Sequence, residues 1–312
     1  MIKINDQIYI DTDSTALAAY TTFRLGGPCK GVCNCTNKEQ LIYALKFIQN
    51  NKSPFLVIGQ GSNLLVSDQG IDAYVLRYFS ETPNIKAMSQ FELEVEGATI
   101  LDHLAAYCAE QGLKGINYAS GIPGTVAGAI VGNAGAYGQQ IGDIVKYVQI
   151  FDTGLGIVKT LEGADLNFAY RESFLKHSND ILLSARLKFS ADNPIELKTE
   201  RQSIINERKD KHPDWHNIPS AGSVFKNVAP TSNGGRRKSA GWFLDEAGAK
   251  NFQINGAKVF PKHANIIIKD GECSAQDVLN LIKKMQEAVR QHFKIELEPE
   301  IRVIGKFTPS QP

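Results

Sequence analysis

The segment from Gly115 to Asp143 constrains the fold of this chain most, because glycine and alanine fill so much of it. It reads GINYASGIPGTVAGAIVGNAGAYGQQIGD, with glycine recurring along its whole length. Glycine reaches backbone angles closed to other residues and lets the main chain press against a partner. The segment can therefore be a loop between close-packed elements, or a path whose peptide groups contact a flat or anionic ligand.

Composition narrows the class of protein. A chain of 312 residues has room for two or three domains. Its 43% hydrophobic and 21% charged residues are typical of a soluble globular protein. Because 34 Lys and Arg balance 33 Asp and Glu, no overall charge draws the chain to nucleic acid or to a membrane surface. We expect small-molecule partners, no nucleic acid and no membrane insertion.

The five cysteines indicate a reducing compartment. They are Cys29, Cys33, Cys35, Cys108 and Cys273. An odd number of cysteines, in a chain whose start is too polar for a secretory signal, predicts free thiols in the cytoplasm. The first three cluster, but no second cysteine pair or spaced histidine pair completes a metal site, so we predict no metal.

Hydrophobic periodicity predicts both helices and strands. A capping box opens a helix at Thr36, another opens a long amphipathic helix after Ser274, and Ile195–Lys211 predicts a polar helix. Phe55–Ile58 predicts a buried strand, and the alternation in Phe91–Glu96 predicts a half-buried strand with its three glutamates facing outward.

Further elements complete an α+β pattern. Short helices are expected from Thr99 to Gly112 and from Ser239 to Gly248, whereas residues 1–35 look irregular. Other strands are expected at 73–78, 145–151, 157–160, 181–189, 266–268 and 295–305. Most of these strands look antiparallel, so the predicted fold class is α+β.

A second glycine-rich turn, GQGSN at Gly59–Asn63, directly follows the predicted strand Phe55–Ile58. Its backbone amides could converge on a pyrophosphate. Leu64 stands where a dinucleotide fingerprint needs its third glycine, and the lysine of an NTPase loop is missing. Taken alone, the turn is compatible with phosphate binding or with a simple strand connection.

Taken together, the two segments resemble a known family. VIGQGSNLLV at 57–66 and SGIPGTVAGAIVGNAGAYG at 120–138 are similar to the flavin-binding segments of the UDP-N-acetylenolpyruvoylglucosamine reductases. TTFRLGG at 21–27 resembles the opening motif of that family. The resemblance continues in order along nearly the whole chain, at 169–174, 221–227, 239–242, 262–265 and 297–302.

The resemblance implies a fold and a reaction. It implies non-covalent FAD in a domain of the vanillyl-alcohol-oxidase/p-cresol-methylhydroxylase type, followed by a C-terminal α+β substrate domain. We expect two flavin subdomains at 1–78 and 79–194 and a substrate domain at 195–312, whose last strand can return to the flavin domain. The implied reaction, in peptidoglycan biosynthesis, reduces UDP-N-acetylenolpyruvoylglucosamine to UDP-N-acetylmuramate, with NADPH as reductant.

The resemblance also assigns ligand-binding residues. Those implied for FAD are Gly59, Gln60, Gly61, Ser62, Asn63, Leu64, Gly121, Ile122, Pro123, Gly124, Thr125, Gly128, Asn133, Gly135, Ala136, Tyr137 and Arg208. Those implied for substrate are Tyr170, Lys211, Asn227 and His263. His263 departs from the family pattern, since some members carry glutamine there, and a histidine brings a charge that depends on pH.

Three catalytic residues are implied. Hydride addition to the enolpyruvyl group pushes electrons onto its carboxylate, and that charge needs a fixed partner. Arg171 offers a planar, permanent positive charge, and Glu300 a carboxyl that can share a proton. Ser223 matches the serine that donates a proton to the adjacent carbon. Without the motifs, these three would be read as a structural arginine, one of several glutamates in a strand and a turn serine.

The interval between Arg171 and Ser223 predicts the subtype. The polar helix and two strand patterns nearly fill it, which favours the shorter subtype, without an inserted substrate loop bearing a tyrosine. The polar segment 229–238 is a candidate flap over the site. Its Arg236–Lys238 run can meet a diphosphate or lie in solvent.

Two other functions stay open on sequence alone. One is another FAD-dependent oxidase or dehydrogenase of the same fold. Such relatives often attach flavin covalently through histidine or cysteine, and neither glycine-rich segment contains a histidine. The other is a flavin- or nucleotide-binding module without chemistry.

Overall fold

The computed structural model describes residues 1–230 and 235–308, which form two compact units. Unit 1 comprises Met1–Ser14, Lys30–Gln60 and Ala73–Arg208, and unit 2 comprises Thr15–Cys29, Gly61–Asp72 and the chain from Lys209 onward. Two N-terminal segments thus belong to the same unit as the C-terminal residues, so the boundaries of the two units do not follow the ranges 1–78, 79–194 and 195–312 expected from sequence. The roles expected for those three ranges stay predictions.

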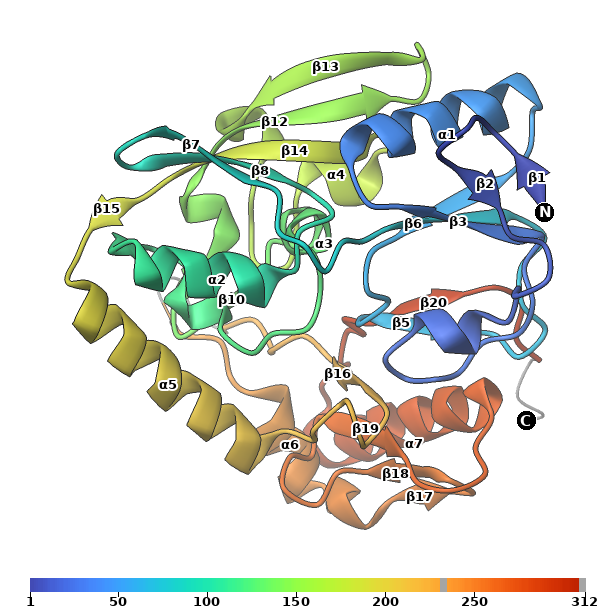
Figure 1. Ribbon diagram of the computed structural model, residues 1–312. Coiled ribbons are helices and arrows are strands. Elements are labelled where there is room, and N and C mark those ends of the chain that lie inside the picture. Colours follow the sequence, from blue (N-terminus) through green and yellow to red (C-terminus); the bar gives the residue numbers. More distant parts are fainter. Residues whose placement is uncertain (231–234, 309–312) are drawn as a thin grey trace. The chain divides into compact units, whose positions relative to one another are not determined.

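A five-stranded antiparallel sheet is the largest sheet of unit 1 (Figure 1). Its strand order is β13-β12-β14-β8-β7. The strands are β7 (Ile85–Ser89), β8 (Glu92–Glu96), β12 (Val145–Asp152), β13 (Ile157–Glu162) and β14 (Ile181–Lys188). The strands expected at 91–96, 145–151, 157–160 and 181–189 are confirmed.

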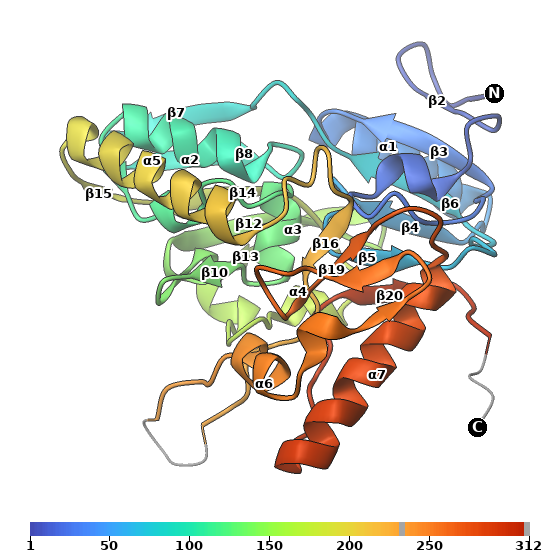
Figure 2. The same ribbon diagram turned by 90° about the horizontal axis from the view of Figure 1, so that it is seen from below.

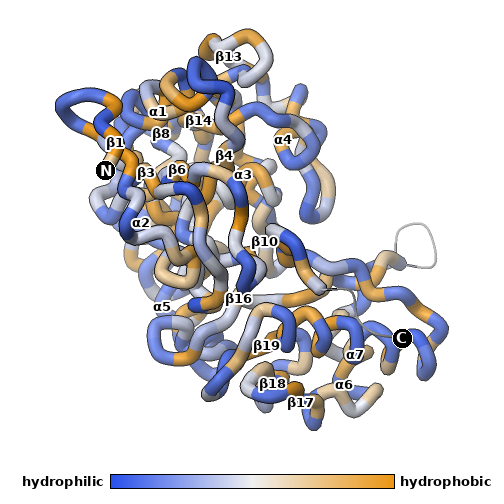
Figure 3. The backbone as a smooth tube through the Cα atoms, turned by 90° about the vertical axis from the view of Figure 1, so that its right-hand side faces the viewer, coloured by the Kyte–Doolittle hydropathy of each residue, from blue (hydrophilic) through white to orange (hydrophobic). Residues whose placement is uncertain are grey.

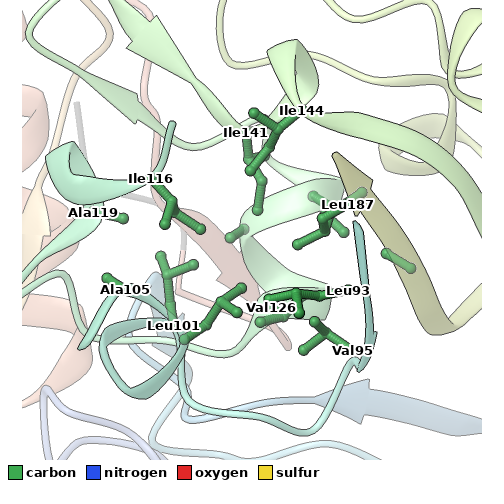
Figure 4. Close-up of a cluster of buried hydrophobic side chains, with 14 of the residues drawn as sticks. Leu93, Val95, Leu101, Ala105, Ile116, Ala119, Val126, Ile141, Ile144 and Leu187 are labelled. Atoms are coloured by element: carbon green, nitrogen blue, oxygen red, sulfur yellow. The ribbon is translucent and has the colours of Figure 1, made fainter. Parts of the chain in front are cut away.

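The main core of unit 1 lies where helices α2 (Leu101–Glu110) and α3 (Val126–Val131) pack against this sheet (Figure 4). Leu93 and Val95 of β8 point into it, as their alternation predicts. The expected outward position of all three β8 glutamates is wrong for Glu96, which is only 8% exposed. Its carboxylate accepts the Lys38 main-chain N–H at 2.9 Å and so joins the sheet to the start of a helix.

A parallel β-α-β unit forms the second part of unit 1. Strands β3 (Gly31–Cys35), β4 (Phe55–Ile58) and β6 (Tyr74–Tyr78) pair in the order β3-β6-β4, next to α1 (Lys38–Asn50). The expected cap Thr36 is wrong by one position. Asn37 caps α1 by accepting the Gln40 N–H at 2.9 Å, whereas the Thr36 hydroxyl is turned to the Gln40 side chain.

The expectation of an irregular stretch over residues 1–35 is also wrong. This stretch contains β1 (Ile2–Lys3), β2 (Tyr9–Ile10), the 3-10 helix η1 (Leu17–Tyr20) and β3. Strand β3 has few signals of its own, because Cys33 and Cys35 are buried where valine or isoleucine would mark a strand. Strand β3 is held by its parallel pairing with β6, which sequence periodicity does not reveal.

Shorter elements and one long helix complete unit 1. The polar helix expected at 195–211 is confirmed as α5 (Pro194–Lys211), whose residues up to Arg208 belong to unit 1. The others are β9 (Leu113–Lys114), η2 (Asn117–Ala119), β10 (Gly135–Ala136), β11 (Gln139–Gln140), η3 (Ile141–Asp143), η4 (Gly163–Leu166), α4 (Phe174–His177) and β15 (Ser190–Ala191).

Unit 2 is built on a four-stranded antiparallel sheet, β16-β19-β18-β17, with helices α6 and α7 beside it (Figure 2). Its elements are β16 (Ser220–Ser223), α6 (Ala240–Glu246), η5 (Ala249–Asn251), β17 (Gln253–Ile254), β18 (Ala257–Val259), β19 (Ile266–Lys269) and α7 (Ala275–Phe293). The caps predicted at Ser239 and Ser274 are confirmed, and the apolar face of α7 is buried.

The last strand is shorter than expected. Only β20 (Arg302–Ile304) forms a ladder, parallel to β5 (Leu64–Val66), which lies in the first range predicted for flavin. Pro299 interrupts the upstream part because it has no N–H to donate, and it makes only an isolated bridge with Phe225. The α+β class is confirmed, although β20-β5 and β3-β6-β4 add parallel pairs to the antiparallel sheets.

Hydrophobic and hydrophilic residues are interspersed along the chain (Figure 3). Among the residues that the structure describes, no helix is both long enough and apolar enough to cross a bilayer.

Candidate functional site

The predicted site residues fall in both units. Unit 1 holds Gly59, Gln60, the predicted residues from Gly121 to Tyr137, Tyr170, Arg171 and Arg208. Unit 2 holds Gly61–Leu64, Lys211, Ser223, Asn227, His263 and Glu300. The turn Gly59–Asn63 therefore contributes to each unit, and each group of residues is described within its own unit.

The two glycine-rich segments meet in unit 1. The Gln60 side chain accepts the Gly124 N–H at 2.6 Å. A Cβ atom on Gly59 would lie 2.5 Å from Oγ1 of Thr125, so only glycine fits there. Thr125 itself caps α3 by accepting the Gly128 N–H at 3.3 Å. The sequence alone suggested that the two segments act together, and these contacts join them directly.

Helix α5 fixes the start of the longer segment through polar contacts. Asp102 accepts the Gly121 N–H at 2.8 Å and two hydrogen bonds from Arg201, at 2.6 and 2.9 Å. Shortly before Gly121 in the chain, the Asn117 side chain donates to the carboxylate of Glu200, which is also on α5, at 2.6 Å. Sequence reasoning missed this set, because Asp102 and Arg201 look like ordinary helix charges.

Two buried polar atoms beside Gly121 lack a protein partner among the described residues. They are the Ser120 hydroxyl and Nε of Arg208. The Arg208 side chain packs on Gly121 and donates from Nη2 to the Tyr118 carbonyl at 3.1 Å. Burial lowers the pKa of Arg208, which nonetheless starts so high that the guanidinium stays charged. Orphaned donors beside a glycine path fit an anionic, hydrogen-bonding ligand such as a flavin dinucleotide.

Asn133 shapes this segment through its side chain. It has a positive φ of 43° and is fully buried. Its amide nitrogen donates to Gln140 at 2.8 Å and to the Ala169 carbonyl at 2.7 Å, and its oxygen accepts the Gly142 N–H at 3.1 Å. These bonds occupy the side chain, so only its main chain is left for the predicted contact with FAD.

The same contacts bring Arg171 to the glycine-rich segment. Ala169 and Glu172 exchange main-chain hydrogen bonds, which places Tyr170 and Arg171 at the tip of a tight turn. Arg171 has a φ of 58°, and its guanidinium donates to the Gly135 carbonyl at 2.9 Å. It also lies 5.1 Å from the centre of the Tyr170 ring. The predicted catalytic arginine and the predicted flavin segment are thus adjacent.

Ser223 ends a strand that contains a bulge. Ser220 pairs with Ile268 and Ser223 with Ile266, so one extra residue is inserted in β16. Gly222 supplies the required conformation with a φ of 73°, and space is open where its side chain would be. Its N–H is held by the Ser220 hydroxyl at 3.1 Å.

The chain after β16 runs beside the segment that contains Glu300. The Glu300 N–H donates to the Val224 carbonyl at 2.7 Å, and the Lys226 N–H donates to the Glu298 carbonyl at 2.9 Å. Nζ of the buried Lys226 also lies 2.6 Å from the Glu298 carboxylate. Within unit 2 the structure therefore places Glu300 beside the residue that follows Ser223.

His263 and Asn227 lie in the same unit, near the start of α6. The Asn227 side chain accepts the N–H of Ala240, the first residue of α6, at 3.2 Å. A Cβ atom on Gly241 would lie 3.3 Å from the His263 ring. Burial lowers the pKa of His263, and the positive charges of Lys250 and Lys211 add to this, although a main-chain hydrogen bond opposes them. The His263 ring therefore stays neutral down to a lower pH than an ordinary histidine does.

Two remaining predictions have partial outcomes. The candidate flap 229–238 includes residues 231–234, which lie outside the described residues. Arg236, Arg237 and Lys238 are exposed, and Arg237 donates to the Asn227 carbonyl at 3.1 Å.

All five cysteines are free thiols, and Sγ of Cys33 lies 3.8 Å from Sγ of Cys35 in the core of unit 1.

Sequence reasoning also missed residues that hold the Ser223 strand. Asn265 bonds to the Phe225 main chain with both ends of its side-chain amide, each at 2.9 Å. The Thr22 hydroxyl donates to the Ser220 carbonyl at 2.7 Å. Both lie in motifs that were recognised, KHAN and TTFRLGG, but nothing local in those motifs shows which strand they contact.

Comparisons with known proteins agree with this geometry. Residues 29–162 match the family model described as FAD binding domain, and residues 212–304 match the C-terminal domain of UDP-N-acetylenolpyruvoylglucosamine reductase. The reductase of Caldanaerobacter subterraneus subsp. tengcongensis is 36% identical over 92% of this chain and 91% of the relative. That of Caldicellulosiruptor bescii is 37% identical over 93% and 90%.

A solved structure agrees along almost the full length. The crystal structure of UDP-N-acetylenolpyruvylglucosamine reductase from Thermus caldophilus superposes with a TM-score of 0.77 at 29% identity, covering 95% of this chain and 100% of that one. The fold and the glycine-rich site thus define a flavoprotein oxidoreductase with FAD as cofactor. Within that class, the chain belongs to the UDP-N-acetylenolpyruvoylglucosamine reductase family.

Proposed function

We propose that this protein uses NADPH to reduce UDP-N-acetylenolpyruvoylglucosamine to UDP-N-acetylmuramate in peptidoglycan biosynthesis. The observation that carries the proposal is the main-chain pairing that sets Glu300 beside the bulged strand of Ser223. The names of the relatives support the same reaction. Because both substrates are water-soluble nucleotides, we propose the cytoplasm as its location.

The residues proposed to hold FAD are given for each unit by itself. In unit 1 these are the glycine path from Gly121 to Tyr137, the Ser120 hydroxyl and Arg208, and in unit 2 the main chain of Gly61–Leu64. When bound, FAD supplies the hydride that NADPH provides and the enolpyruvyl group accepts. The cofactor performs the redox step, so the protein groups have to bind the substrate, stabilise charge and move a proton.

Arg171 has the properties needed to stabilise charge. Its tight turn and its bond to Gly135 restrict its side chain, so little reorganisation is needed when charge develops. A guanidinium stays positive at every physiological pH and matches the planar geometry of a carboxylate. We assign Arg171 to the substrate carboxylate, whose negative charge grows as hydride adds to the enolpyruvyl methylene carbon.

Ser223 and Glu300 complete the proposed chemistry. We assign to the Ser223 hydroxyl the proton that reaches the carbon beside the carboxylate, and to Glu300 the stabilisation of the enolate-like state with Arg171. A hydroxyl is a weak acid, so its donation depends on partners that offset its transient charge. The bulge at Gly222 and the main-chain hydrogen bond between Glu300 and Val224 fix the backbone that carries the side chains of Ser223 and Glu300.

The substrate contacts follow the chemistry of a diphosphate and a sugar. We propose that Tyr170, Lys211, Asn227 and His263 bind these groups, and that the enzyme is of the shorter subtype. Lysine supplies a point charge, and asparagine and a neutral histidine supply hydrogen bonds. Arg236–Lys238, next to Asn227, is a second source of positive charge for the diphosphate.

Two half-reactions test the proposal. The purified protein is expected to be yellow with releasable FAD, to lose its colour with NADPH in the absence of oxygen, and to regain it with UDP-N-acetylenolpyruvoylglucosamine. A yellow protein that NADPH does not bleach would be a binding module. One that is bleached but not reoxidised by this substrate would be another flavoenzyme of the same fold.

A single substitution tests the proton donor. Ser223→Ala is expected to leave reduction by NADPH unchanged and to slow reoxidation by the enolpyruvyl substrate roughly a hundredfold or more. The reductive half-reaction of the same variant is the internal control. Equal damage to both half-reactions would remove Ser223 from the proton-donor role.

A further inference from the structure

Thr22 lies in the TTFRLGG motif, to which the proposed mechanism gives no task. It is 6% exposed and belongs to unit 2. Its N–H donates to the Gly61 carbonyl at 3.3 Å. Its hydroxyl donates to the Ser220 carbonyl at 2.7 Å, and its own carbonyl accepts the Ser220 N–H at 3.2 Å. Thr22 thus joins the predicted cofactor turn to the start of the Ser223 strand.

A second connection runs between the same turn and the same strand. Nδ2 of Asn63 donates to the Glu300 carbonyl at 3.2 Å, and the Asn63 carbonyl accepts the Arg302 N–H at 3.0 Å. The Glu300 N–H in turn donates to the carbonyl of Val224, the residue after Ser223. The side chain of Asn63, which sequence assigned to the cofactor, is therefore engaged with the backbone of Glu300.

These two connections close a ring of hydrogen bonds within unit 2. From the turn, one arm passes through Thr22 to Ser220, and the other passes through Glu300 to Val224. Ser223 and the bulge at Gly222 lie on the stretch of strand between the two arms. A closed ring fixes both ends of that stretch, so the bulge cannot shift along its partner strand without breaking one of these bonds. Of the two side-chain bonds, the one from Thr22 to Ser220 is buried, whereas the one from Asn63 to Glu300 is exposed.

We propose that Thr22 is a positioning residue for the reaction, and that its hydroxyl keeps the Ser223 strand in register with the cofactor turn. The inference rests on the proposed function, since it concerns the delivery of the Ser223 proton. Its consequence is specific to one step. Reduction of the flavin by NADPH takes no proton from Ser223, whereas proton delivery needs Ser223 at a fixed distance from the substrate, and a small displacement costs much of the rate.

The test compares two adjacent threonines. Thr22→Val keeps the shape and removes the hydroxyl that reaches β16. Thr21→Val is the matched control, because Thr21 is also 6% exposed and its hydroxyl donates to a carbonyl, that of Leu25, at 2.9 Å within its own loop. Thr22→Ser restores the hydroxyl and is the rescue variant. Unfolding midpoints and FAD dissociation constants are measured for all three, so that a folding defect is recognised.

We expect Thr22→Val to slow reoxidation by the enolpyruvyl substrate roughly ten- to a hundredfold and to raise the solvent isotope effect on that step. Reduction by NADPH and FAD affinity are expected to match those of Thr21→Val, and Thr22→Ser to recover most of the rate. Thr22→Val and Thr21→Val showing equal reoxidation rates would overturn the inference. So would a loss in Thr22→Val that is shared by both half-reactions.

The wild-type protein separates this inference from the proposed function. If UDP-N-acetylenolpyruvoylglucosamine does not reoxidise the reduced wild-type enzyme, the function itself is wrong. If it does, and Ser223→Ala slows only that step while Thr22→Val resembles Thr21→Val, the function stands and Thr22 has no positioning role.

Discussion

The guanidinium of Arg201 on α5 holds the carboxylate of Asp102 on α2 through two hydrogen bonds, of 2.6 and 2.9 Å. The same carboxylate accepts the N–H of Gly121, so one partly buried ion pair joins two helices to the glycine-rich segment. Helix α5 buries only Leu197 and Ile204, and such polar contacts must therefore supply much of its attachment to unit 1.

Asp102→Asn is expected to lower the free energy of unfolding by about 1–3 kcal/mol, because Arg201 keeps its charge in a partly buried site and loses its ionic partner. Urea unfolding checks this. Asp192→Asn is the control, since Asp192 pairs in the same unit with Lys114, whose side chain is 62% exposed and can be hydrated when its partner is lost. We expect a clearly smaller loss there. Equal losses would contradict the structural role of the Asp102 pair.

The pH dependence of stability gives the same pair a second signature. Burial raises the pKa of Asp102, but the hydrogen bonds from Arg201 and Gly121 outweigh it, and the net pKa lies below its ordinary value. A lowered carboxylate pKa contributes stability above the unfolded value of about 3.9, which is lost as the pH falls through the folded value. We expect Asp102→Asn to lack this acid-sensitive part of the unfolding curve.

Two glycines with positive φ are predicted to differ in their tolerance of alanine. A Cβ atom on Gly61, at φ 68°, would lie 2.1 Å from the Tyr20 carbonyl oxygen, whereas at Gly138, with φ 80°, nothing lies within 4 Å. We expect Gly138→Ala to cost only the conformational strain of about 1 kcal/mol. Gly61→Ala adds a steric clash and should cost several times more. Thermal unfolding of both variants checks the order, and similar midpoints would count against it.

Arg171→Lys is expected to slow reoxidation of the reduced enzyme by the enolpyruvyl substrate roughly a hundredfold, because lysine cannot present a planar fork to a carboxylate. Rapid mixing under nitrogen measures the rate. Arg186→Lys is the control, because Arg186 pairs with Glu92 and Glu94 on the sheet of unit 1. It should lower stability without changing this rate, and a normal rate in Arg171→Lys would exclude the proposed role.

His263 is expected to make the folded state sensitive to mild acid. Its pKa is lowered, mainly by burial, so the unfolded chain binds the proton more readily. Stability should then fall as the pH drops from about 6.5 through the folded pKa. His263→Gln should lose this component, whereas His292→Gln, on the exposed side of α7, should retain it. An NMR titration placing the His263 pKa at or above its ordinary value would contradict the expectation.

The sequence identified most elements that have strong local signals. The capping box and apolar stripe of α7 and the alternation of Leu93 and Val95 in β8 all appear where the sequence pattern placed them. Signals failed where burial depends on a distant partner. Strand β3 was missed because cysteines carry its buried face, and Glu96 was expected in solvent because its partner at Lys38 comes from another element.

The residue motifs by themselves determined the family, the cofactor and the class of chemistry. The match at 57–66 around a glycine turn and the match at 169–174 around Arg171 are local properties of the chain, so they can be read without coordinates. Only the tertiary structure decided which main-chain groups elsewhere in the chain form hydrogen bonds with the side chains of each motif. Thr22 contacts Ser220, Asn63 contacts Glu300, and Asp102 contacts Gly121. These pairs are distant in sequence, and a hydrogen bond's direction depends on folded geometry that residue spacing does not encode.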